Sequence, residues 1–282
     1  MTPRHAHPES LSPLVRRSLA CCVAVGLLLL AGCASPGGTA GGAGAGAGAD
    51  LVTESDESPE RKRARIRIEL AVGYFEQGRT EFALDEVKQA ISSDPSFAPA
   101  YNLRGLIFMR LNDMRQAEES FRRALAINPR DADTLHNQGW LLCQQGRYEE
   151  ALGAFRQALV NPLYAGRAKT YMTQGLCQAR AGRFEDAEQS LARSYELDAG
   201  NPVTGYNLAN LLLRRNELER AQFYIRRLNN GEFANAESLW LGIRVEHRLG
   251  DKLAMTQLAE QLRKRYPQSR ELAAYDRGAF NE

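Results

Sequence analysis

LAVGYFEQGRTEFALDEVKQAISSDP, residues 70–95, and RGLIFMRLNDMRQAEESFRRALAINP, residues 104–129, share one pattern at a spacing of 34 residues. In both stretches, small residues, large apolar residues and a closing proline occupy the same positions. The matched pairs are Ala71 with Gly105, Tyr74 with Phe108, Gly78 with Asn112, Ala83 with Ala117, Val87 with Phe121, Ala90 with Ala124 and Pro95 with Pro129. A fixed period of this length indicates stacked repeats rather than one globular core.

The pattern continues along the chain and resembles the tetratricopeptide repeat, a helix-turn-helix unit of about 34 residues. A two-residue insertion near residues 165–167 shifts the register once. The six resulting units are 64–97, 98–131, 132–165, 168–201, 202–235 and 236–269, and residues 270–282 follow as a C-terminal tail. We therefore expect an all-α fold, a right-handed tetratricopeptide-repeat α-solenoid with a concave face, preceded by a signal peptide and a flexible linker.

Two columns of the repeat predict how each unit is built. Small residues where the two helices cross, such as Gly139 with Ala151, allow the backbones to approach closely. Between the helices, a glycine or an asparagine suits the left-handed conformation of a helix C-cap. These turn residues are Gly78, Asn112, Gly146, Gly182, Asn216 and Gly250.

Units four and six depart from the pattern. Gln178 and Glu246 occupy the position of the large apolar residue seen as Tyr74, and bulky residues replace small ones in unit six. We expect unit six to act as an end-cap and the protein to be a monomer.

The first 32 residues are typical of a secretory signal peptide. Arg16 and Arg17 precede an apolar stretch, residues 18–31, that is too short to cross a bilayer as a helix. The tetrapeptide that follows, residues 30–33, reads Leu-Ala-Gly-Cys and resembles the lipobox of bacterial lipoproteins. The resemblance implies cleavage before Cys33, a diacylglycerol on its thiol and acylation of its new amine.

The residues after Cys33 predict where the protein is held. Ala34 stands where inner-membrane lipoproteins commonly have aspartate, so the lipoprotein resemblance implies the outer membrane, with the protein facing the periplasm. Residues 33–63, the lipidated cysteine and a Gly/Ala-rich stretch, cannot pack a core. We expect them to form a disordered tether.

Composition and motifs exclude several functions. Without residues 1–32 the chain has 33 basic and 33 acidic residues, which argues against nucleic-acid binding. Two of the four histidines lie in the signal peptide, and His136 and His247 fall in different repeats. No motif of a hydrolase, a metalloenzyme or a nucleotide-binding protein is present. We expect no catalytic residues, no metal site and no cofactor, so the protein is not predicted to be an enzyme.

Cys143 and Cys177 allow two interpretations, because the periplasm oxidises thiols. They lie on the first helices of neighbouring repeats, either as half-buried apolar side chains or as a disulfide. Their positions point about 160° apart around equivalent helices, since each residue advances about 100°. That angle favours two thiols.

The surface lined by the first helices offers a candidate binding site. Six apolar residues, which we call the apolar strip, are predicted to lie there in units one to three: Ile68, Val72, Phe75, Leu106, Met109 and Trp140. In units five and six the same face is mixed and basic, with Tyr206, Leu213, Arg214, Trp240, Arg244 and Arg248. An exposed apolar strip typically binds a partner. The alternative is that residues 51–62 cover it.

The chain resembles one family in particular, the PilF/PilW type IV pilus biogenesis lipoproteins, the pilotins of the PilQ secretin. The lipobox, six repeats, the stretch 105–129 and the sequence NPLY at residues 161–164 carry the resemblance. It implies that the protein binds secretin subunits and promotes their delivery to the outer membrane and assembly into multimers. Other readings are an envelope scaffold that gathers peptidoglycan hydrolases, a peptidoglycan-cleaving enzyme, or a self-assembling structural protein.

Overall fold

The computed structural model describes residues 56–281. The signal peptide 1–32, the lipidation at Cys33 and the tether up to residue 55 lie outside the described residues. Within the described part, no helix is both long enough and apolar enough to span a membrane.

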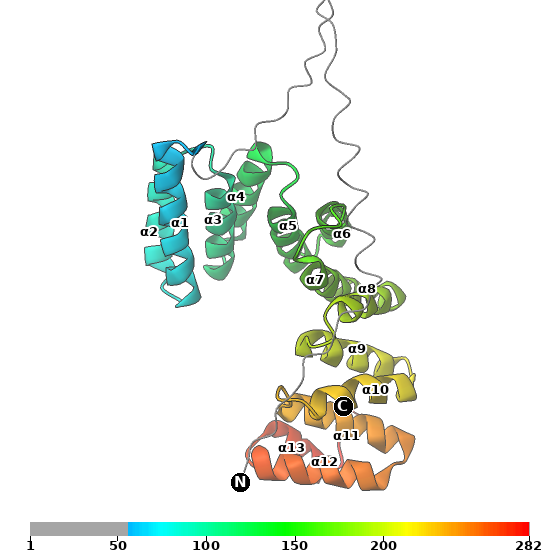
Figure 1. The fold of residues 1–282 in the computed structure, drawn as a ribbon. Coiled ribbons are helices and arrows are strands. Elements are labelled where there is room, and N and C mark those ends of the chain that lie inside the picture. Colours follow the sequence, from blue (N-terminus) through cyan, green and yellow to red (C-terminus); the bar gives the residue numbers. More distant parts are fainter. Residues whose placement is uncertain (1–55, 282) are drawn as a thin grey trace, which may run out of the picture. The chain divides into compact units, whose positions relative to one another are not determined.

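Residues 56–281 form helix-turn-helix pairs that follow one another in chain order (Figure 1). The pairs are α1 (Pro59–Glu76) with α2 (Thr80–Ser93), α3 (Ala98–Arg110) with α4 (Met114–Ile127), α5 (Ala132–Gln144) with α6 (Tyr148–Ala158), α7 (Arg167–Arg180) with α8 (Phe184–Leu197), α9 (Pro202–Arg214) with α10 (Leu218–Asn229), and α11 (Ala236–Leu249) with α12 (Lys252–Arg265). A last helix, α13 (Arg270–Asp276), packs against α11 and α12. The predicted all-α tetratricopeptide array is confirmed.

The turn inside each pair contains one residue with positive φ, as the sequence predicted. The values of φ are 75° at Gly78, 59° at Asn112, 76° at Gly146, 76° at Gly182, 64° at Asn216 and 78° at Gly250. The amide after each of these residues donates to a carbonyl near the end of the first helix, as Arg79 does to Tyr74 at 2.9 Å. This hydrogen bond closes the first helix and directs the chain into the second.

The small residues of the first helices make room for large side chains of the second helices. A Cβ atom at Gly139 would lie 2.7 Å from the ring of fully buried Phe155, and Gly175 has the same relation to Leu191. The sequence had paired Gly139 with Ala151, whereas the nearest atoms belong to Phe155, one helical turn later. The space left by the absent side chain of Gly139 is therefore filled by the aromatic ring of Phe155.

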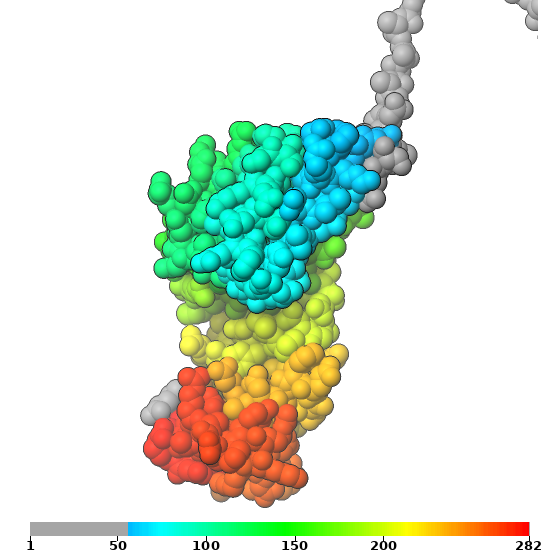
Figure 2. All heavy atoms as spheres, turned by 90° about the vertical axis from the view of Figure 1, so that its left-hand side faces the viewer, coloured from blue at the N-terminus to red at the C-terminus, as the bar shows by residue number. Residues whose placement is uncertain are grey.

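First helices of successive pairs contact each other, as in α1 with α3, α3 with α5, α5 with α7, and α9 with α11. We call the surface that α1, α3, α5, α7, α9 and α11 form together the first-helix face. Side chains of successive pairs pack together between neighbouring helices, and Figure 2 shows the pairs following one another in chain order from blue to red. The core is thus a series of adjacent clusters, one after another.

The two ends of the array differ from the boundaries that the sequence suggested. Residues 59–63, assigned to the tether, belong to α1, because the Ser58 side chain accepts from the amide of Arg61 and Pro59 starts the helix. Residues 270–282, expected only as a tail, begin with α13, which Ser269 caps. Leu272 of α13 is buried against α11 and α12.

Candidate functional site

The apolar strip lies on α1, α3 and α5. Most of its residues pack against one of three hydrophobic core clusters. Ile68 and Phe75 pack around Ala71, Leu106 and Met109 pack around Leu141, and Trp140 packs beside Cys143. All six lie in the first three repeats, and all except Val72 pack into these clusters.

Exposure varies along the strip. Val72 is 38% exposed, whereas the other five side chains are half-buried. Of the segment 51–62, residues 59–62 form the first turn of α1, and Arg61 there hydrogen-bonds Ser96 at 3.0 Å. Residues 59–62 thus extend α1, and Glu57 before them pairs with Arg65 of the same helix at 3.1 Å.

Two arginines cover the aromatic residues of the strip. The guanidinium carbon of Arg110 lies 3.6 Å from the ring centroid of Phe75, and the same side chain donates to the Phe75 carbonyl oxygen. Arg180 lies 4.8 Å above the ring of Trp140 in the same way. Each arginine ends the first helix of the following repeat, so a cation covers the ring from the next repeat.

Arg110 and Arg180 were not predicted as part of the strip, although the sequence carries a signal for them. Each stands two residues before the left-handed turn residue, and Arg214 and Arg248 occupy the same register. The column of arginines is visible once the turn residues are aligned.

Cys143 and Cys177 form a disulfide between α5 and α7, with their Cα atoms 5.8 Å apart. The prediction of two thiols was wrong. Side chains on two neighbouring parallel helices meet when one points forward along the array and the other points back. An angle of about 160° between equivalent positions is therefore the condition for contact. Both cysteines are buried.

The NPLY sequence forms the turn between α6 and α7. The Asn161 side chain accepts from the Leu163 amide at 2.9 Å, and the Tyr164 hydroxyl donates to Asp133 at 2.9 Å. Burial, with a contribution from Asp133, raises the pKa of Tyr164 to about 12. Leu163 itself is 89% exposed at the tip of this turn.

The two described histidines lie on different helices, α5 and α11. His136 is 4% exposed, its Nδ1 lies 2.9 Å from the Thr170 hydroxyl, and burial lowers its pKa to about 4. A neutral, enclosed imidazole of this kind fills the core. Among residues 56–281, no group of three His, Cys, Asp or Glu side chains is arranged to hold a metal.

The two departures from the repeat pattern have different outcomes. Glu246 is fully buried on α11, where its carboxylate accepts from Arg226 Nε at 2.7 Å and from Gln222 Nε2 at 2.8 Å. Gln178 is also buried, and within the described residues its Oε1 has no hydrogen-bond partner. The carboxylate is thus paired and hydrogen-bonded, as a buried charge requires.

The basic part of the first-helix face lies on α9 and α11. Arg214 and Arg248 are exposed, while Tyr206, Trp240 and Arg244 are half-buried. Leu213, which was expected on this face, is only 3% exposed and belongs to the core.

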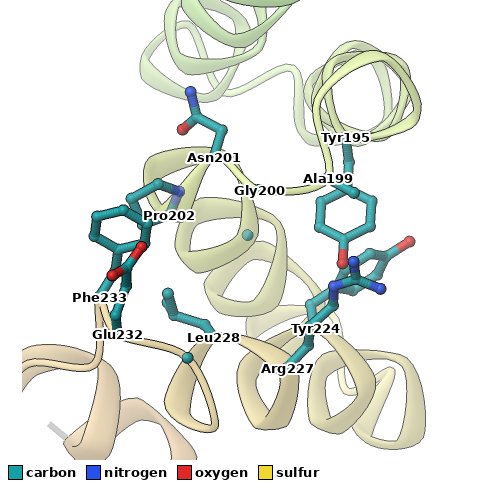
Figure 3. A pocket seen from close by; sticks show the side chains of 12 residues that line it. Tyr195, Ala199, Gly200, Asn201, Pro202, Tyr224, Arg227, Leu228, Glu232 and Phe233 are labelled. Atoms are coloured by element: carbon teal, nitrogen blue, oxygen red, sulfur yellow. The ribbon is translucent and has the colours of Figure 1, made fainter.

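A separate pocket of about 230 Å³ lies beside α8 and α10 and was not predicted (Figure 3). Figure 3 shows Tyr195, Tyr224 and Arg227 on one side of it and Pro202, Phe233 and Glu232 on the other. The rings of Tyr195 and Tyr224 meet edge to face at 4.9 Å. The pocket depends on two loops between repeats, which the repeat pattern does not specify.

Comparison with known proteins agrees with the fold. Residues 96–159, 136–202 and 178–238 each match the tetratricopeptide repeat. The chain is 32% identical over 204 residues to the type IV pilus assembly protein PilF of Pseudomonas aeruginosa, an alignment that spans 72% of this chain and 81% of that protein.

Two solved structures are also similar. The structure of Pseudomonas aeruginosa PilF aligns with a TM-score of 0.71 and 29% identity, covering 78% of this chain and 100% of that one. PilW, described as a widely conserved type IV pilus biogenesis factor, aligns with a TM-score of 0.69 and 30% identity, covering 75% of this chain and 97% of that one.

Proposed function

Because the chain belongs to the PilF/PilW family of type IV pilus assembly proteins, we propose that it binds subunits of the secretin channel. In doing so it promotes their delivery to the outer membrane and their assembly into multimers. The observation that carries this proposal is the apolar strip on a scaffold of this family. The partner is a secretin protein, and the chain acts as a binding protein without catalysis.

The strip is suited to a peptide or an amphipathic segment of the subunit. Val72 is exposed beside half-buried Phe75, which gives an apolar surface that a partner side chain can cover. Arg110 and Arg180 lie over the two aromatic rings and supply positive charge at the same place. A segment that combines apolar and acidic side chains matches both features.

The lipobox resemblance supports the second half of the proposal. Lipidation at Cys33 would hold the protein at the outer membrane, facing the periplasm, and the Gly/Ala-rich residues that follow would give it reach. A subunit captured by the strip is then brought to the membrane in which the channel forms. Replacement of Cys33 by serine in the full chain should leave the protein in the soluble periplasmic fraction.

The strip is tested with charged substitutions in the full chain, expressed in cells that lack the endogenous gene. Val72→Glu and Phe75→Glu should abolish heat-resistant secretin multimers in the outer-membrane fraction, because each places a charge in the apolar contact. The matched control is Phe82→Glu, which changes an aromatic residue that is 52% exposed on α2, outside the first-helix face.

Circular dichroism of each purified variant establishes that the helices remain. Multimers that form normally with both strip variants would overturn the role of the strip. Affinity capture that recovers peptidoglycan hydrolases and no secretin would instead favour a general envelope scaffold.

A further inference from the structure

After α13 the chain folds back onto the first-helix face of the sixth repeat. Gly278 has a φ of 69°, and its amide donates to the Tyr275 carbonyl at 2.9 Å. The Ala279 amide donates to the Ala274 carbonyl at 3.0 Å. This turn places Phe280 beside α11 rather than beyond α13.

Phe280 occupies a slot with aromatic walls. Its ring stacks on His247, with the centroids 4.2 Å apart and the planes 23° from parallel. Trp240 lies 5.8 Å from the ring and Tyr275 meets it edge to face at 5.9 Å. The Phe280 carbonyl oxygen accepts from Arg244 Nε at 3.2 Å. The α11 surface thus binds both the side chain and the backbone carbonyl of Phe280. Peptide-binding sites typically combine the same two kinds of contact.

Three of the residues that contact Phe280 come from one helix face, and Tyr275 comes from α13. Trp240, Arg244 and His247 are spaced four and three residues apart on α11, so they point the same way. They belong to the first-helix face, on which the apolar strip also lies. The slot is therefore a second position on that face, five repeats along the chain from the start of the strip.

Three arginines lie at or beside the slot, and the carboxylates of Glu237 and Glu271, which lie near Trp240, pair with Arg270 instead. Arg214 ends α9, and Arg244 and Arg248 lie on α11. Burial, together with the like charges of Arg214 and Arg248, lowers the pKa of Arg244. Within residues 56–281 none of these three guanidinium groups forms a salt bridge, although Arg248 donates to the Asn216 side chain at 2.6 Å. The charge is available to an acidic ligand.

Within the part of the chain that the structure describes, only one hydrogen bond connects the turn to α11. The amides of Gly278, Ala279 and Phe280 all bond to carbonyls within residues 274–278. Lifting the turn would therefore break one hydrogen bond to α11, the one from Arg244. Residues 278–280 could therefore move out of the slot together, while α13 stays packed against α11 and α12 through Leu272.

We propose that the slot on α11 is a peptide-binding subsite and that Phe280 is its internal, displaceable occupant. The ligand is a segment of a partner protein that carries an aromatic side chain with acidic residues close to it. The ring of that segment replaces Phe280 on His247 and Trp240. Its backbone carbonyl takes the Arg244 hydrogen bond, and its acidic groups meet Arg214 and Arg248. This subsite does not rest on the proposed binding of secretin.

The test uses the full chain and labelled heptapeptides, with binding followed by fluorescence anisotropy. The probes are DRGAFNE, the sequence of residues 276–282, and DEGAFNE, in which glutamate replaces the arginine. Phe280→Ala empties the slot, so we expect it to bind DRGAFNE at least tenfold more tightly than the unchanged chain does. DEGAFNE should bind more tightly still and should weaken more steeply with added salt.

Matched controls identify the slot. Adding Arg244→Gln to Phe280→Ala should remove most of the gain, and the peptide DRGAANE should not bind. Phe223→Ala, which alters an aromatic residue that is 59% exposed on α10, should behave like the unchanged chain. If Phe280→Ala lowers the melting temperature, Phe280→Leu, which keeps apolar bulk without ring stacking, takes its place.

Equal binding of DRGAFNE and DRGAANE, or no gain on removal of the Phe280 ring, would overturn the proposal. Failure here is distinguishable from failure of the pilus proposal, because secretin multimers report on the apolar strip and the heptapeptides report on α11.

Discussion

Arg110 lies with its guanidinium carbon 3.6 Å above the ring of Phe75, and so connects the end of α3 to the end of α1. The contact joins the first two repeats at the strip through a cation on an aromatic face. Removing the cation should therefore affect both the stability of the first repeats and the charge of the strip.

We expect Arg110→Ala to lower the free energy of unfolding by about 1 kcal/mol, because the exposed cation–π contact is lost. Urea denaturation followed by circular dichroism measures it. Arg115→Ala, which changes an exposed arginine on α4, serves as the control and should have no measurable effect. If both variants lost the same free energy of unfolding, the effect would come from the change in net charge and not from the contact with Phe75.

The close approach at Gly139 predicts a large effect of a single methyl group. Gly139→Ala should cost about 1 to 3 kcal/mol of stability, because its Cβ would collide with the ring of Phe155. Gly153→Ala on α6 is the matched change, since the nearest atom to a Cβ there is 3.9 Å away. It should stabilise by up to about 1 kcal/mol through helix propensity. A destabilised Gly153→Ala would show that helix propensity does not govern this site.

The disulfide should contribute strongly to stability. It connects residues 34 positions apart, and a closed loop of this length corresponds to about 2 to 4 kcal/mol. Urea denaturation with and without dithiothreitol should show that loss in the unchanged protein. In the double variant Cys143→Ala, Cys177→Ala, the reductant should change nothing.

His136 makes stability depend on pH. Its pKa is about 4 in the folded protein against about 6.5 when unfolded, so between these values the unfolded chain binds more protons. Stability from this group is complete above pH 6.5 and is lost as the pH falls towards 4. We expect a decrease of about 2 kcal/mol between pH 8 and pH 5.

The control for this pH dependence is His136→Gln, which cannot gain a proton in that range. Denaturation curves at pH 8, 6 and 5 should be closer together for this variant than for the unchanged chain. An identical pH dependence in both proteins would place the titrating group elsewhere.

The features that lie inside a single repeat, such as its turn and its buried positions, could be predicted from the sequence. Asn112 and Asn216 could be assigned to left-handed turns because only a few residue types tolerate that backbone conformation. The same local logic paired Val87 with Phe121, and both side chains are fully buried. Helix pairs follow from such columns because each one constrains a short stretch of chain.

Relations between repeats were harder to predict. The disulfide depends on how α5 and α7 face each other across the shifted register, and the covering of Trp140 by Arg180 depends on the same geometry. The start of α1 and the helix α13 lie at the ends of the repeat pattern, where a capping serine decides the boundary. The turn at Phe280 follows α13 and has no counterpart in the other repeats.

The disulfide also has a mechanical consequence. In a linear array each repeat is stabilised by its neighbours, so loss of structure begins at the ends and advances inward one repeat at a time. A covalent link between the third and fourth repeats stops that advance at the middle. We expect the first two repeats, which hold most of the strip, and the sixth repeat, which holds the slot, to unfold and refold independently of each other, each next to the same crosslinked centre.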